Sequence, residues 1–163
     1  MRRTVGITTG LTAAVLLSLV ALGCGSSTDV KAKTYVANLS PANEVPTKTT
    51  TGTGVVTFVD EGTDILWTME LTNMTNVTVS HIHGPALTGV NGNVIFNLFF
   101  PNQPPPTGTL NGLVAQGTLT NAYNSGVSLD SLRVLFNNGN AYVNVHTVAN
   151  PGGEIRDQIH PVP

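Results

Sequence analysis

The chain has 163 residues, of which 40% are hydrophobic and 10% charged, and its formal net charge is −2 at pH 7. This length accommodates one domain with a sizeable apolar core, and the acidic balance argues against nucleic-acid binding, which depends on basic surfaces. Because there is a single cysteine, one chain alone forms neither a disulfide nor a metal site with several thiolates.

The first 23 residues have the pattern of an export signal. Arg2 and Arg3 precede an apolar run over residues 11–20, which is shorter than the roughly 20 residues of a membrane-spanning helix. Cys24 follows this run directly after Gly23, an arrangement that resembles a bacterial lipoprotein signal. We therefore expect a signal peptide over residues 1–23, lipidation of Cys24 and a flexible tether over residues 24–34. The alternative is an ordinary secretory peptide with an unmodified cysteine.

Beyond the tether, short apolar runs alternate with turns rich in Gly, Asn, Pro and Thr. Residues 54–59 and 65–72 flank a turn and predict a hairpin, in which Trp67 is a core anchor. Between 128 and 136 leucines recur at helical spacing behind Ser128, a good N-cap, which predicts a short helix. The other strands are predicted at 35–39, 77–83, 93–100, 113–119, 141–147 and 154–159. This pattern indicates an all-β fold: an antiparallel Greek-key sandwich or barrel with one short helix.

Two histidines end the predicted strand 77–83. His81 and His83 are two residues apart, so their side chains share a face with Cβ atoms about 7 Å apart. Strict alternation places Val77 and Val79 on the same face, which predicts that the core-facing side runs from apolar residues into the two histidines. A buried imidazole without a partner is costly, so this face must open to solvent, meet hydrogen-bond partners or hold a ligand.

A third histidine, His146, ends the predicted strand 141–147. It shares a face with Tyr142 and Asn144, while Val143 and Val145 take the apolar face. Three neutral imidazoles suit copper or zinc. The predicted metal ligands are therefore His81, His83 and His146. The alternative is that these side chains only bond to backbone. Ring nitrogens within about 3–4 Å would favour a metal and separations beyond about 8 Å a structural role, since metal–nitrogen bonds are about 2 Å.

Three blocks of the chain resemble, in order, the CHRD (chordin) domain. They are residues 39–46 (LSPANEVP), residues 81–86 (HIHGPA) with Gly89 and Asn91-Gly92, and residues 142–147 (YVNVHT) with 150–156 (NPGGEIR). One departure is Asp157, where the family usually has glycine. The resemblance covers residues 35–160 and implies an extracytoplasmic β domain. The family occurs in animal chordins, regulators of growth factors, and in many exported bacterial proteins, and it does not imply one activity.

A fainter resemblance is to copper/zinc superoxide dismutase, in the order of the His-x-His pair, the strand ending in Val-x-Val-His and the glycine-rich turn before an arginine. It implies that His81, His83 and His146 occupy copper-ligand positions and that Arg156 lies near the arginine that attracts superoxide. This chain has no counterpart of that family's bridging histidine, zinc-loop ligands or cysteine pair.

Other polar residues are candidates to support such a site. Glu154 and Arg156 are two apart on a strand and could pair with each other or with a neighbour. With Asn144, they are candidates to orient the ligands or to guide an anion. Glu44 lies between two prolines, where its carboxylate could close a loop.

The resulting hypothesis is a lipid-anchored CHRD-like domain in the bacterial cell envelope, on the periplasmic or cell-surface side, that holds copper; zinc suits the same ligands. The expected partners are the membrane, through Cys24, and a protein of the envelope. One alternative is a non-catalytic interaction or structural module without metal. The other is a dismutase-like enzyme, the sole enzymatic candidate.

Overall fold

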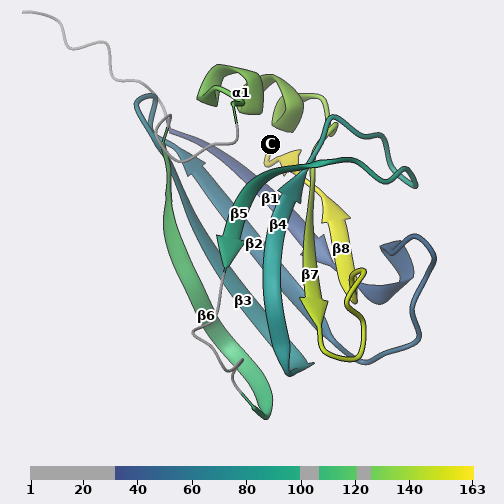
Figure 1. The fold of residues 1–163 in the computed structure, drawn as a ribbon. Helices are drawn as coiled ribbons and strands as arrows, with labels where there is room; N and C mark the ends of the chain where they lie inside the picture. The colour runs from purple at the N-terminus through teal and green to yellow at the C-terminus, as the bar shows by residue number, and fades with distance from the viewer. Residues whose placement is uncertain (1–31, 100–106, 121–125) are drawn as a thin grey trace, which may run out of the picture.

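A computed structural model describes residues 32–99, 107–120 and 126–163. The predicted signal peptide, Cys24 and most of the tether lie outside the described residues. Two antiparallel sheets pack face to face, with a short helix at one end (Figure 1). The predicted all-β sandwich is confirmed, and the described strands form two separate sheets rather than a closed barrel. Within these ranges no helix has the length and apolar character needed to cross a membrane.

The larger sheet has five strands in the order β6-β3-β2-β1-β9. These are β6 (Thr109–Leu119), β3 (Ile65–Thr75), β2 (Thr53–Asp60), β1 (Lys33–Leu39) and β9 (His160–Pro161). Buried and exposed residues alternate along β3 from Ile65 to Leu71, as predicted. Trp67 is 5% exposed, and a Cβ on the neighbouring Gly117 would approach its indole to 3.0 Å. Glycine at this position therefore leaves room for the one tryptophan of the chain.

The smaller sheet has four strands in the order β5-β4-β7-β8. These are β5 (Val94–Phe99), β4 (Val77–His83), β7 (Tyr142–Thr147) and β8 (Ile155–Gln158). In the antiparallel pairing of β4 with β7, His81 lies opposite Asn144 and His83 opposite Tyr142. The fold thus brings together two segments that lie far apart in the sequence, side by side in Figure 1.

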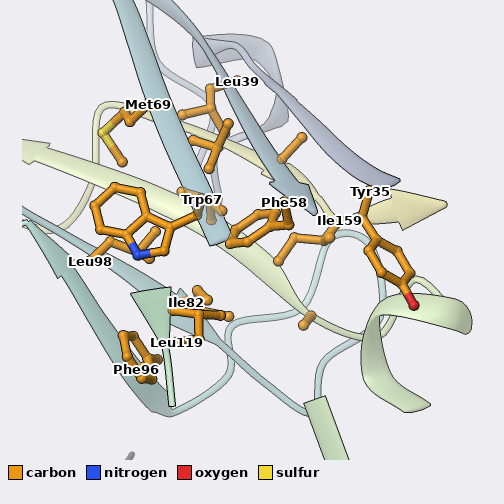
Figure 2. Close-up of a cluster of buried hydrophobic side chains, with 14 of the residues drawn as sticks. Tyr35, Leu39, Phe58, Trp67, Met69, Ile82, Phe96, Leu98, Leu119 and Ile159 are labelled. Carbon is orange, nitrogen blue, oxygen red and sulfur yellow. The ribbon is translucent and has the colours of Figure 1, made fainter. Parts of the chain in front are cut away.

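The core fills the space between the two sheets. Figure 2 shows side chains from both sheets that gather there, among them Phe58 and Trp67 from the larger sheet and Ile82 and Phe96 from the smaller one. Phe58 and Ile82 are fully buried. Burial of apolar area of this kind contributes about 25 cal/mol per Å² and is the main favourable term that holds such a sandwich together.

The helix α1 (Leu129–Asn137) closes one end of the sandwich. It begins behind Ser128, whose Oγ accepts a hydrogen bond from the backbone N–H of Ser131, so the predicted N-cap is confirmed. The ring of Phe136 lies 5.4 Å from that of Tyr35 and 5.1 Å from that of Phe58, between centroids. These contacts connect the helix to the core.

Several elements extend beyond their predicted bounds because backbone pairing continues past the apolar pattern. β1 begins at Lys33, within the predicted tether, and β6 begins at Thr109 rather than at 113. His160, beyond the last predicted strand, pairs with β1 as part of β9, although its side chain is exposed. The proline-flanked loop contains a short 3-10 turn, η1 (Pro41–Asn43). Phe100 lies outside the described residues.

One prediction about β4 is wrong: its histidines do not face the core. The pairing with β7 shifts register between Val77 and Val79, and such a bulge changes which face the following residues occupy. Val77 and Ile82 are both fully buried in the core. His81 and His83 alternate with Ile82 and therefore lie on the outer face of the smaller sheet, where they are half-buried.

Candidate metal centre

The outer face of the smaller sheet brings the three predicted histidines together. His81 and His83 come from β4 and His146 from β7, and one ring nitrogen of each lies within 4.8 Å of the others. His81 Nδ1 and His146 Nε2 are 3.1 Å apart. Two nitrogens bound to one ion at about 2.1 Å can be at most about 4.2 Å apart, so a small inward rotation of the rings would complete the set. The set extends slightly beyond the roughly 3–4 Å expected for metal ligands and lies well inside the roughly 8 Å that would favour a purely structural role, so these residues could hold a metal ion.

Backbone carbonyl groups fix the tautomers of two of the histidines. His83 Nδ1 lies 3.0 Å from the carbonyl oxygen of Gly92, and His146 Nδ1 lies 2.9 Å from that of Pro151. A carbonyl oxygen can only accept, so each Nδ1 carries the proton and donates it. The Nε2 atoms of His83 and His146 consequently carry a lone pair, the form in which imidazole binds a metal. In this structure the lone pair of His146 Nε2 accepts a hydrogen bond from His81 Nδ1, which a bound metal would replace.

An unpartnered atom shows that the residues fit a metal ion. His83 Nε2 is buried and has no hydrogen-bond partner among the residues that the structure describes. A buried acceptor without a partner costs about 1–3 kcal/mol, and an ion bound at this nitrogen would remove that cost. The donor set of three neutral nitrogens is one that copper and zinc both accept.

Burial favours the neutral form of the three imidazoles. It lowers the pKa of His81 to about 4, with a further lowering from the neighbouring His146 and His83. Burial also lowers the pKa values of His83 and His146. Metal ligands must be deprotonated, so these lowered pKa values favour the neutral form of the cluster, which is the form that can bind a metal.

We expect the metal-free domain to lose stability as the pH falls below about 6.5, the usual pKa of histidine in an unfolded chain. His81 has a pKa of about 4 in the folded state, so the unfolded state binds more protons between these two values. The free energy of unfolding therefore decreases as the pH falls through this window. Urea unfolding at pH 7.5, 6 and 5 measures this decrease in the free energy of unfolding. A His81→Gln variant should have a shallower dependence, and equal slopes would contradict the expectation.

Tyr142 holds both His83 and the loop that orients it. The two rings stack with centroids 4.8 Å apart and an interplanar angle of 4°. The hydroxyl of Tyr142 accepts a hydrogen bond of 3.2 Å from the backbone N–H of Gly92, whose carbonyl in turn accepts from His83. Ring and loop therefore fix the orientation of this ligand together.

Arg156, on β8, holds the loop that contains Gly92. Its guanidinium donates to the carbonyl of Val90 at 3.1 Å and to Oδ1 of Asn91 at 2.8 Å, and it lies 4.0 Å above the ring of Tyr142. The side chain is only 2% exposed. Arg156 had been considered both for orienting the ligands and for guiding an anion; its burial and its bonds to the loop favour the orienting role.

Glu154 supports the contact between His146 and the carbonyl group of Pro151. Instead of pairing with Arg156, its Oε2 accepts hydrogen bonds from Thr147 Oγ1 at 2.6 Å and from Asn150 Nδ2 at 3.0 Å. These bonds brace the turn over residues 147–154, which presents the carbonyl of Pro151 to His146. Glu154 thus positions a ligand through the backbone.

Asn144 connects the histidines to a buried acid that the sequence left as a loop-closing residue. Asn144 lies opposite His81, and its Nδ2 donates to Oε1 of Glu44. Glu44 is 4% exposed. Burial raises the pKa of this carboxyl, and the backbone N–H of Val45 and the charge of Arg156 partly oppose that rise. The available sequence signal was an acid held between two prolines.

A family model, the CHRD domain, matches residues 35–159. The chain belongs to the CHRD domain family. The matched range includes the histidine cluster and the loops that orient it, and it confirms the resemblance found in the sequence. Comparison with curated proteins and with solved structures found no match.

Proposed function

We propose that this CHRD domain holds a copper ion through His81, His83 and His146, with zinc as the other metal that these ligands suit. The observation that carries the proposal is the buried, unpartnered Nε2 of His83, directed by a carbonyl bond at the opposite ring nitrogen. Copper, when bound, would supply one-electron redox chemistry. The lipoprotein-like sequence around Cys24 supports a site on the exported side of a bacterial membrane.

Holding or delivery of the ion is the role that the surroundings favour. Each ligand has an orienting group, directly from Gly92 or Pro151 or through a neighbouring ring. The dismutase alternative would use Arg156 to attract an anion, but this guanidinium lies beneath the loop over residues 84–93. A centre built this way is suited to binding a metal firmly rather than to recruiting an anionic substrate.

Metal titration of the exported portion, residues 25–163, prepared without a His-tag, tests the proposal. We expect stoichiometric binding of Cu(II) or Zn(II), followed by absorption and calorimetry, and a rise in the melting temperature. Free metal at 100 times Kd stabilises the folded state by about 2.7 kcal/mol, which corresponds to a rise of about 10 °C for a domain of this size.

The controls are two histidine variants. The double variant His81→Ala/His83→Ala should show neither binding nor thermal stabilisation. His160→Ala removes an exposed histidine outside the cluster and should respond like the wild type. If the double variant and the wild type respond alike, the metal proposal fails and the interaction module becomes the better hypothesis.

A further inference from the structure

The positive charge of Arg156 lies close to the proposed centre, and the ring of Tyr142 separates it from the imidazole of His83. Arg156 comes from β8 and His83 from β4, the strands on either side of β7, so the ring of Tyr142 lies between guanidinium and imidazole. The guanidinium is 4.0 Å from the Tyr142 centroid, and the imidazole centroid lies 4.8 Å from it on a nearly parallel plane.

This charge has no counter-charge in direct contact. In the ranges that the structure describes, no carboxylate lies within ion-pair distance of Arg156. Its hydrogen bonds go to neutral acceptors, Val90 O and Asn91 Oδ1. With 2% exposure, the guanidinium is little screened by water or salt.

We propose that Arg156 makes the centre prefer monovalent over divalent copper. The inference rests on the proposed function, because it requires copper at the three histidines. Neutral imidazoles contribute no negative charge, so the repulsion from a buried cation is greater for Cu(II) than for Cu(I). The charge and the centre are separated by the stacked contacts of Arg156, Tyr142 and His83. At this separation, in a medium of effective dielectric constant about 20, a unit charge changes the affinity for Cu(II) relative to that for Cu(I) on the order of tenfold.

Glu44 carries a charge opposite to that of Arg156. It therefore allows an internal check of the effect of charge on the preference between the two copper ions. It is a buried acid hydrogen-bonded by Asn144, which lies opposite His81 in the smaller sheet. Its carboxylate favours the divalent ion. Removing the two charges separately should therefore shift the preference in opposite directions, whereas general damage to the site would weaken binding of both ions together.

The experiment measures Kd for Cu(I) and for Cu(II) by competition with chelators of known affinity at pH 7.5. Arg156→Gln should lower the ratio Kd(Cu(II))/Kd(Cu(I)) about tenfold, which corresponds to about 59 mV in reduction potential. Glu44→Gln should raise the ratio severalfold. Arg156→Lys retains the charge and should leave the ratio within about threefold of the wild type.

Opposite shifts in Arg156→Gln and Glu44→Gln would support the inference. An unchanged ratio in either variant, or shifts in the same direction, would overturn it while leaving copper binding intact. If Arg156→Gln does not fold, a raised ratio in Glu44→Gln together with a ratio within about threefold of the wild type in Arg156→Lys would support the inference, and any other result would overturn it. A wild-type protein that binds neither copper ion would overturn the proposed function itself, and this inference with it.

Discussion

Replacement of Gly153 by alanine should destabilise the domain by about 3–5 kcal/mol and weaken metal binding severely. Gly153 has φ 124°, a conformation that residues with a Cβ rarely adopt. The added methyl would also lie 2.6 Å from Asn144 Nδ2 and 2.8 Å from Glu44 Oε1. Displacing these groups would break a buried hydrogen bond and move the turn that presents Pro151 to His146.

Gly152→Ala is the matched control, one residue earlier in the same turn. A Cβ at Gly152 has nothing within 4 Å, so the variant should remain within about 0.5 kcal/mol of the wild type. Urea unfolding gives the free energy and metal titration gives the affinity. Equal stability of the two variants would show that the turn tolerates a rearrangement around Gly153.

The second large effect is expected at the closed end of the sandwich. Phe136→Ala should lower the free energy of unfolding by about 3–5 kcal/mol, because it removes a fully buried aromatic side chain and leaves a cavity. The rings of Tyr35 and Phe58 would lose their contacts with it. A total stability of about 5–15 kcal/mol is usual, so this variant should be close to unfolding.

Val134→Ala on the same helix is the control, since Val134 is 58% exposed and should change stability little. Folded Phe136→Ala protein should bind metal within about threefold of the wild type, because α1 covers the end of the sandwich and the histidines lie on the outer face of the smaller sheet. If Phe136→Ala unfolds at the same urea concentration as Val134→Ala, the helix does not contribute to the core as described.

Local patterns in the sequence were sufficient to predict the fold class. The alternation around Trp67 and the helical spacing behind Ser128 are properties of single segments, and both elements formed as predicted. The orientation of β4 was not predictable in the same way. The bulge between Val77 and Val79 depends on how β4 pairs with β7, and strict alternation applied to β4 alone therefore assigns its histidines to the wrong face.

The proposed ligands were also accessible from sequence, because histidine is scarce here and the three lie at strand ends. The groups that orient these histidines could not be predicted from the sequence. The groups that orient His83 and His146 are backbone carbonyls, which have no side-chain signature. Glu44 is linked to the site through its contact with Asn144, about a hundred residues later in the chain. Such contacts depend on the tertiary fold.

The placement of Trp67 has a practical consequence for all of these measurements. It is the one tryptophan of the chain and lies in the core on β3, whereas the histidine cluster lies on the outer face of the opposite sheet. Its fluorescence emission should shift to longer wavelength when the core opens to water. Absorption by a bound copper ion reports whether the histidine cluster on the outer face holds its metal. Fluorescence and absorption recorded on one sample can therefore separate a variant that has lost its fold from one that has lost its metal.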